Sequence, residues 1–238
     1  MPGIATRSPG GVLPSRGACG RARYPVRCCG ARRALHVGRE DSLGHDGPKG
    51  LLQALDGRNL VLVGLPGAGK SSVGRRLAAQ LAIPFVDADS EIEKAAGMSI
   101  SDIFATHGEA AFREGETRVI SRILQDGPLV LATGGGAFMS ADTRRAIAAH
   151  GIAIWLDAAT DILVARISKR THRPMFHNVD ARAKLKELRA VRDPVFAEAP
   201  IRVVSSSGPQ ERVVGAILRA LRQYSLAAEP TPQQAASQ

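Results

Sequence analysis

Short apolar segments alternate with longer segments of helical periodicity between Asn59 and Tyr224. In "KSSVGRRLAAQLA", for example, Val73, Leu77 and Leu81 recur at helical spacing directly after the apolar run "NLVLVG". The apolar segments cover residues 59–64, 84–89, 129–136, 152–157 and 201–206. The helical patterns cover residues 70–82, 101–126, 140–150, 160–170, 181–195 and 210–224. Apolar strands that alternate with helices are typical of a parallel sheet buried on both faces, so the pattern predicts one α/β domain.

The two ends of the chain differ from this region in composition. Residues 1–40 contain seven Gly and four Pro, which interrupt any apolar period. We therefore expect a disordered basic arm over residues 1–56, a folded domain over 57–225 and a disordered tail over 226–238. The arm is rich in Arg, as transit peptides are, but its Ser is sparse and its Gly and Pro are unfavourable for an amphipathic helix. We expect a cytoplasmic protein, and organellar import of the arm is the alternative.

The formal net charge of +10 is concentrated near the amino terminus. Residues 1–50 contain nine Lys or Arg and three acidic residues (+6), whereas the remainder contains 23 basic and 19 acidic residues (+4). Because the predicted domain is nearly balanced and aromatic residues make up only 4% of the chain, we expect no nucleic acid partner. An ATPase that binds nucleic acid through the arm is the alternative from a different class. No apolar run approaches the ~18 residues that a membrane helix needs, so we expect no membrane partner. The three cysteines lack zinc-type spacing.

The segment "GLPGAGKSS", Gly64–Ser72, matches the pattern G-x-x-x-x-G-K-[ST] in full. It follows an apolar strand and precedes a helical pattern, which is the context that this phosphate-binding loop (P-loop) requires. The glycines allow backbone N–H groups to surround an anion, and the helix directs its positive end toward it. We expect Lys70 to reach the outer phosphates and Ser71 to ligate Mg²⁺. The loop alone leaves the phosphate acceptor open.

Candidates for the acceptor side begin with "FVDADSEIE". Residues two apart in an extended segment point the same way, so Asp87 and Asp89 can both face the loop. One carboxylate can hold Mg²⁺ through water, and the other can accept hydrogen bonds from a substrate hydroxyl. The alternative is that Asp89 or Ser90 caps the following helix. The next strand ends at Thr133 and is followed by three glycines, which favour close approach by a ligand over a simple tight turn.

Three arginines are candidates for binding anionic groups. Arg113 and Glu116 lie three apart on a helical face, where the glutamate can orient the guanidinium for bidentate recognition of a carboxylate. Arg173 precedes Pro174 in a polar segment that can serve as a lid over the phosphates, and Arg192 is a second candidate for the anionic substrate. Taken singly, each of these arginines would be read as a solvated surface residue or part of a surface ion pair.

Taken together, these residues resemble the shikimate kinase family, which transfers the γ-phosphate of ATP to the 3-hydroxyl of shikimate. The resemblance spans about residues 59–223 in family order and rests on "GLPGAGKSS", "FVDADSEIE", "DIFATHGEAAFREGE", "LATGGGA", the "RP" lid and the segment "RDPVF". It implies a five-stranded parallel sheet of order 2-3-1-4-5, as in the nucleoside monophosphate kinase group, with a mobile lid and a monomeric protein. A degenerate, regulatory relative is the third possibility, but all the chemistry-bearing residues are present.

Carried over by position, the resemblance also implies the site residues. It gives ATP-binding roles to Gly67, Ala68, Gly69, Lys70, Ser71, Ser72, Arg166 and Arg173. Shikimate-binding roles fall to Asp89, Arg113, Gly134, Gly135, Gly136 and Arg192. Lys70, Asp89 and Arg173 would be catalytic, with Asp89 accepting the proton of the 3-hydroxyl, while Ser71 and Asp87 would hold one Mg²⁺. The sequence departs from the family at residues 205–211, which lack a clear counterpart to the second adenine contact, and at Phe196, where Tyr is usual.

Overall fold

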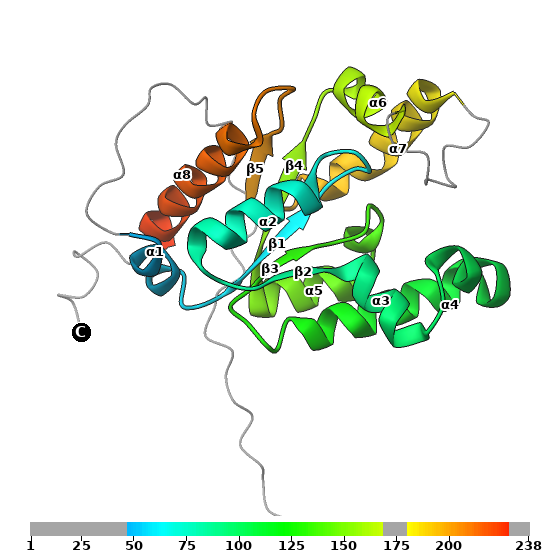
Figure 1. Ribbon diagram of the computed structural model, residues 1–238, viewed down its shortest axis with the longest axis horizontal. Helices are drawn as coiled ribbons and strands as arrows, with labels where there is room; N and C mark the ends of the chain where they lie inside the picture. Colours follow the sequence, from blue (N-terminus) through cyan, green and yellow to red (C-terminus); the bar gives the residue numbers. More distant parts are fainter. Residues whose placement is uncertain (1–46, 169–179, 229–238) are drawn as a thin grey trace, which may run out of the picture. The chain divides into compact units, whose positions relative to one another are not determined.

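The computed structural model describes residues 47–168 and 180–228, which form a five-stranded sheet covered by helices (Figure 1). The strands pair in the order β2-β3-β1-β4-β5, and every pair is parallel. The predicted α/β fold and the strand order are therefore confirmed. The strands are β1 (Asn59–Val63), β2 (Phe85–Asp87), β3 (Val130–Ala132), β4 (Gly151–Asp157) and β5 (Ile201–Val204).

Helices follow the strands along the chain and lie against both faces of the sheet. They are α1 (Pro48–Ala54), α2 (Lys70–Leu81), α3 (Ala88–Ala96), α4 (Ile100–Ile123), the 3₁₀ helix η1 (Ala137–Met139), α5 (Ala141–His150), α6 (Thr160–Ser168), α7 (Ala181–Phe196) and α8 (Gln210–Ala228). In Figure 1, α2 and α8 lie beside each other and cover one face together with α1, whereas α4 and α5 cover the other. Within the described ranges, no helix combines the length and the apolarity needed to cross a membrane.

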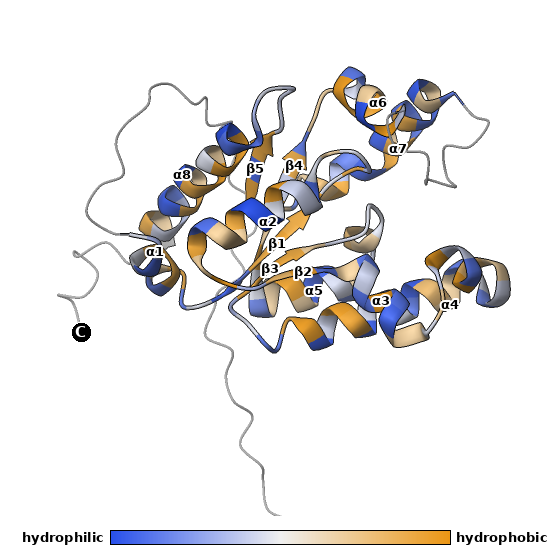
Figure 2. Ribbon diagram, viewed as in Figure 1, coloured by the Kyte–Doolittle hydropathy of each residue, from blue (hydrophilic) through white to orange (hydrophobic). Residues whose placement is uncertain are grey.

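Burial on both faces explains why the strands read as continuous apolar runs. All residues of β1 and of β4 are buried, and the central strands are among the most hydrophobic segments in Figure 2. This matches the composition of parallel strands that are covered by helices on each side. The central strands β1, β3 and β4 therefore show no alternation of apolar and polar residues, whereas the edge strand β5 alternates between buried and exposed residues.

One aromatic cluster packs α7 onto the sheet. Phe196, the last residue of α7, is fully buried, and its ring centroid lies 6.2 Å from that of Phe138 in η1. The ring centroid of Trp155 in β4 lies 6.0 Å from that of Phe196. Phe196 therefore serves as a packing residue. A phenyl ring suits this buried position, because it has no hydroxyl group that would need a hydrogen-bond partner.

The register of the strands aligns the candidate site residues at one edge of the sheet. Asp87 of β2 and Leu62 of β1 are both paired with Ala132 of β3. The residues that follow, including Gly64 and Thr133, therefore lie at neighbouring carboxyl ends, where ligands bind in open parallel sheets.

The folded region begins earlier than we expected. Helix α1 lies within the residues 1–56 assigned to the arm, and its Leu51 and the following Leu55 are buried in the main hydrophobic core. Helix α8 also continues to Ala228, past the expected domain end at residue 225. A seven-residue helix is too short to show a clear apolar period, and packing against the core rather than propensity stabilises it.

Two further differences concern helix boundaries. Asp87, rather than Asp89 or Ser90, caps α3, because its Oδ1 accepts a hydrogen bond of 3.2 Å from the backbone N–H of Asp89. The long pattern at residues 101–126 is a helix interrupted at Gly108, where φ is 78° and ψ is 174°. Only glycine adopts this conformation readily, so the chain changes direction there without strain.

Candidate active site

The P-loop joins the end of β1 to the start of α2. Gly64, Gly67 and Gly69 have φ values of 139°, 88° and 99°, in the region that side chains disfavour. A Cβ on Gly64 would lie 2.5 Å from the carbonyl oxygen of Leu156, so this position also requires glycine for close packing. Helix α2 begins at Lys70, so its amino-terminal N–H groups and the positive end of its dipole lie at the loop. The loop therefore has the backbone geometry of an anion-binding site.

The polar residues of the loop are arranged around it. Lys70 Nζ donates hydrogen bonds to the carbonyl oxygens of Gly64 (2.8 Å) and Leu65 (3.1 Å), so the ammonium group lies over the loop. Ala68 is buried, whereas Ser72 is half-buried in the first turn of α2. The lysine is thus held where the motif places the charge that reaches the outer phosphates.

Ser71 and Asp87, the two residues expected to hold a metal ion, are in direct contact with each other. Ser71 Oγ donates a 2.7 Å hydrogen bond to Asp87 Oδ2, and Asp87 Oδ1 accepts from the N–H of Asp89. The hydroxyl and the carboxylate are hard oxygen donors next to the phosphate loop, a set that suits Mg²⁺. If both residues held the ion, phosphate oxygens and water would have to supply its remaining ligands.

Arg166 links α6 to the P-loop and to the turn after β5. Its Nη1 donates to the carbonyl oxygens of Gly67 (3.3 Å) and Ala68 (3.2 Å), and to Ser205 Oγ (3.1 Å). Its Nη2 donates to the carbonyl oxygen of Ser206 at 2.6 Å. Burial lowers the pKa of Arg166 from its ordinary value. The two serines lie in the segment for which the sequence suggested no role, and the structure places them next to the loop.

Each of the three glycines after β3 makes room for a different neighbour. A Cβ on Gly134 would lie 2.8 Å from Glu116 Oε1 and 2.9 Å from Asp89 Oδ1. On Gly136 it would lie 2.7 Å from Arg113 Nη2. These contacts bring the predicted acceptor residues of α3 and α4 together at one loop.

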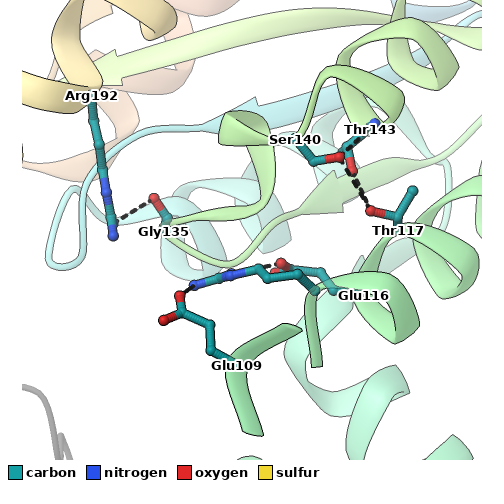
Figure 3. A network of polar contacts seen from close by, with 8 residues as sticks. Glu109, Glu116, Thr117, Gly135, Ser140, Thr143 and Arg192 are labelled. Carbon is teal, nitrogen blue, oxygen red and sulfur yellow. Dashed lines mark hydrogen bonds and ion pairs between the residues drawn. The ribbon is translucent and has the colours of Figure 1, made fainter. Parts of the chain in front are cut away.

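Gly135 connects this loop to both the P-loop and α7. A Cβ there would lie 2.9 Å from the Cγ and Cδ atoms of Pro66, so the backbone of the glycine loop lies directly against the P-loop. Its carbonyl oxygen accepts a 2.9 Å hydrogen bond from Arg192 Nη1 (Figure 3). The sequence did not assign a role to Pro66, because an apolar side chain in the variable part of the motif has no distinctive signature.

Arg113 is paired with two glutamates of α4, Glu109 and Glu116, which are labelled in Figure 3. Its Nη1 donates to Glu116 Oε2 at 2.7 Å, and its Nη2 forms a weaker ion pair with Glu109 Oε1 at 3.4 Å. The side chain of Glu116 is 2% exposed, and its Oε1 has no hydrogen-bond partner within the described residues. Burial raises the pKa of Glu116 from 4.5, and the hydrogen bond and charge of Arg113 oppose that rise.

Arg192 of α7 approaches the same place from the opposite side (Figure 3). Burial lowers the pKa of Arg192 from its ordinary value, the positive charge of Arg113 lowers it further, and Glu109 and Glu116 counteract this. The two guanidinium groups therefore share one electrostatic environment. Paired cations with only partial compensation are suited to an anionic ligand, and a carboxylate matches their planar geometry.

A cluster of partly buried hydroxyl groups supports α4 behind this site. Thr117 Oγ1 lies 3.0 Å from Thr143 Oγ1 and 3.4 Å from Ser140 Oγ, which caps α5 (Figure 3). Thr143 is fully buried. Because Thr117 directly follows Glu116, these contacts fix α4 where it presents its ion pair. Sequence reasoning missed the cluster, since three separate hydroxyl residues form no recognisable motif.

The structure thus assembles the predicted residues of the P-loop, of β2 and α3, of α4, of the glycine loop and of α7 at one edge of the sheet. Arg173, with the predicted lid, lies outside the described residues. A parallel sheet of order 2-3-1-4-5, a P-loop that opens α2 and a neighbouring group of acidic and basic side chains together define a P-loop kinase.

Comparison with known proteins identifies the branch of this class. The shikimate kinase family profile matches residues 66–222, more than half of the 238-residue chain, and the chain belongs to that family. It is 48% identical over 174 residues to a shikimate kinase of Bradyrhizobium diazoefficiens, covering 73% of this chain and 84% of that protein. It is 51% identical over 172 residues to one of Caulobacter vibrioides, covering 72% and 86% respectively.

Solved structures agree with this assignment. The shikimate kinase from Acinetobacter baumannii in complex with shikimate is 35% identical, with a TM-score of 0.68, over 71% of this chain and 95% of that one. The enzyme from Aquifex aeolicus is 31% identical, with a TM-score of 0.60, over 71% and 98%. The resemblance seen in the sequence is therefore confirmed, and the protein is an ATP-dependent kinase.

Proposed function

We propose that this protein transfers the γ-phosphate of ATP to the 3-hydroxyl of shikimate, giving shikimate 3-phosphate and ADP. The observation that carries the proposal is the convergence of Asp89, Arg113 and Arg192 on the three-glycine loop, which itself lies against Pro66 of the P-loop. A small hydroxylated acid bound at these residues would be beside the phosphates. Shikimate has both the carboxylate and the hydroxyl groups that this set of side chains would recognise.

Each half of the site has its own proposed role. Arg113 and Arg192 hold the carboxylate of shikimate, and the backbone of Gly134–Gly136 allows the ring to approach closely. Asp89 accepts hydrogen bonds from the hydroxyls and takes the proton of the 3-hydroxyl. The hydroxyl oxygen then bonds to the γ-phosphorus as the bond to the departing ADP oxygen breaks. Because phosphoryl transfer has a loose transition state, placement and charge contribute more than the strength of the base.

On the nucleotide side, Lys70 neutralises charge on the transferring phosphoryl group, and the N–H groups of residues 67–72 surround the phosphates. Arg173 would add positive charge from the lid, a role that rests on the family resemblance. Arg166 would contact the nucleotide from α6. Closure of a lid would exclude water and thereby limit hydrolysis of ATP.

The proposed metal is one Mg²⁺, which neutralises phosphate charge when it is bound. Ser71 would ligate it directly and Asp87 through water, consistent with the 2.7 Å contact between their oxygens. As partners we propose ATP and shikimate alone, without nucleic acid or membrane, and a cytoplasmic monomer. Metal titration of Asp87→Asn tests the first point, because the variant should need a higher Mg²⁺ concentration for half-maximal rate.

The decisive experiment is an ATP-consumption assay of the full chain against shikimate, quinate, gluconate and nucleoside monophosphates. We expect turnover with shikimate well above the ATPase background. Arg113→Ala should chiefly raise the KM for shikimate, whereas Arg118→Ala, an exposed arginine on the same helix, should match the parent enzyme. Absence of shikimate-dependent turnover would overturn the proposed substrate, and unchanged shikimate kinetics in Arg113→Ala would overturn the carboxylate clamp alone.

A further inference from the structure

Strand β4 ends in Asp157, a buried carboxylate that the proposed reaction does not use. Its side chain is 10% exposed, and both oxygens are engaged. Oδ1 accepts a 3.0 Å hydrogen bond from Arg189 Nη2, and Oδ2 accepts one of 2.6 Å from Arg202 Nη2. In many P-loop enzymes an aspartate at the end of a strand serves the metal. Here the arginines occupy both oxygens, which indicates a different task.

Arg189 uses its guanidinium in three directions. Besides Asp157, it donates through Nη1 to the carbonyl oxygen of Ala158 at 2.7 Å and pairs through Nε with Asp193 Oδ2 at 3.0 Å. Only an arginine presents donors in this fixed fork, so a lysine could satisfy one of the partners but not all. The side chain is 25% exposed and joins α7 to the end of β4.

The same helix carries Arg192 of the substrate site. Arg189, Arg192 and Asp193 are spaced by three and four residues, so their side chains project from one side of α7. Any rotation or shift of α7 that breaks the contact between Arg189 and Asp157 would also move Arg192 from its 2.9 Å hydrogen bond with Gly135. The network at β4 and the substrate site are thus joined by a single helical turn.

The contact between Arg189 and Asp157 matters because Arg192 lies close to a second positive charge. Arg192 faces the positive charge of Arg113, which works against keeping the two guanidinium groups together in the absence of an anion. Phe196 anchors the end of α7 by packing, which resists separation but is non-directional. A forked, charge-assisted contact fixes direction as well. Asp157 supplies that contact from a rigid position at the end of a buried strand.

We propose that Arg189, anchored by Asp157, is a positioning residue that holds Arg192 in place for the carboxylate of the substrate. The inference rests on the proposed function, since it concerns the binding of shikimate. Asp193 belongs to the same network. Burial raises the pKa of Asp193, the charge of Arg189 opposes this rise, and the negative charge of Asp157 adds to it. The positive charge of Arg189 therefore offsets the repulsion between the two neighbouring carboxylates.

The test compares kcat/KM for shikimate in the full-length Arg189→Gln, Arg192→Ala and doubly substituted proteins. We expect Arg189→Gln to lower kcat/KM for shikimate about tenfold, while the KM for ATP stays unchanged. Because Arg189 acts through Arg192, the same substitution should cause almost no further loss in the Arg192→Ala background. Lys184→Gln, which removes an exposed ion pair with Glu187 on the same helix, is the matched control and should retain parental kinetics.

A second variant separates positioning from folding. Arg189→Lys keeps a positive charge between Asp157 and Asp193 but lacks the fork, so it should fold and still lose kcat/KM for shikimate. The proposal is overturned if the loss is equally large with and without Arg192, if both Arg189 variants match Lys184→Gln, or if both fail to fold. Failure of the proposed function would look different, because the parent enzyme itself would not turn over shikimate.

Discussion

Arg113 and Glu116 form a 2.7 Å ion pair in which only the arginine reaches solvent, with side-chain exposures of 30% and 2%. The buried carboxylate of Glu116 is therefore not available to contact a ligand, and it orients the guanidinium of Arg113 instead. Its second oxygen lies beside Gly134, and Arg113 itself lies beside Gly136. The ion pair and the glycine loop are thus fitted to each other, and changes to either should be detected in shikimate binding.

The protonation state of Glu116 should make the KM for shikimate depend on pH in the acidic range. Since burial raises its pKa above 4.5, the native protein holds this proton more tightly than the unfolded chain. Its contribution to the free energy of unfolding therefore falls as the pH rises from 4.5 through the raised pKa. Above that range Glu116 is ionised and orients Arg113, whereas lowering the pH into it protonates Glu116 and should raise the KM for shikimate.

Glu116→Gln is the variant that checks this prediction. It keeps the shape of the side chain but loses the charge, so the KM for shikimate at neutral pH should rise about tenfold, in line with the loss of one charge-assisted hydrogen bond. A profile of KM against pH should then lack the acidic increase seen in the parent. The explanation is wrong if the variant retains the parental increase.

Gly136→Ala should affect shikimate binding without unfolding the protein. The added Cβ meets the guanidinium of Arg113, the far end of a flexible side chain, which can shift away. We expect a rise of about tenfold in the KM for shikimate and a melting temperature close to that of the parent. The matched control is Gly215→Ala in α8, where a Cβ meets no atom closer than 3.5 Å and helix propensity favours alanine. Equal kinetics in the two variants would contradict the fit between Arg113 and the glycine loop.

Lys70→Ala should abolish turnover and leave the fold intact. In the structure the ammonium group donates to carbonyl oxygens of the P-loop, which the backbone of the loop supplies whatever the side chain. Its removal takes away the main side chain that would neutralise charge on the transferring phosphoryl group. A fall of at least about a hundredfold in kcat is expected. Thermal melting and steady-state kinetics measure both quantities, and substantial residual kcat would assign the charge neutralisation to other groups.

Asn59 offers a stability prediction that is independent of the site. Its Nδ2 donates to the carbonyl oxygens of Leu124 and His150, and its Oδ1 accepts from the N–H of Leu129, all at the amino end of β1. Asn59→Ala leaves these backbone groups without partners and should lower the free energy of unfolding by about 3 kcal/mol. Urea unfolding measures the loss. The KM values of the folded enzyme should not change, because the substituted residue lies at the opposite end of the sheet from the P-loop.

Much of the fold could be predicted from the sequence because its strongest signals are physical constraints. The buried strands appear as apolar runs, and the P-loop needs glycine at fixed positions. Helix α1 could not be predicted, since Leu51 and Leu55 gain their partners only in the folded protein. The interruption at Gly108 was also hidden, because the apolar pattern continues across it.

The candidate site shows the same division. Residues with a charge or a motif, such as Lys70 and Arg113, could be named from the sequence. Pro66 could not, because its contact with Gly135 depends on how two loops meet. Arg189 and Asp157 were equally hidden: they are 32 residues apart, and a surface arginine on a helix is the usual interpretation of such a residue.

The interruption of α4 at Gly108 has a consequence for how the protein fluctuates. Ile92, Ile103 and Phe112 form a hydrophobic cluster of α3 and α4 that is separate from the main core. A small cluster whose residues lie on both sides of this glycine break should open locally at a lower free energy than global unfolding. Amide hydrogen exchange should therefore be faster in residues 88–107 than in β1 or β4. The helices next to the proposed shikimate site would then open locally before the central sheet does. Bound shikimate should slow amide exchange in these helices more than bound ATP does.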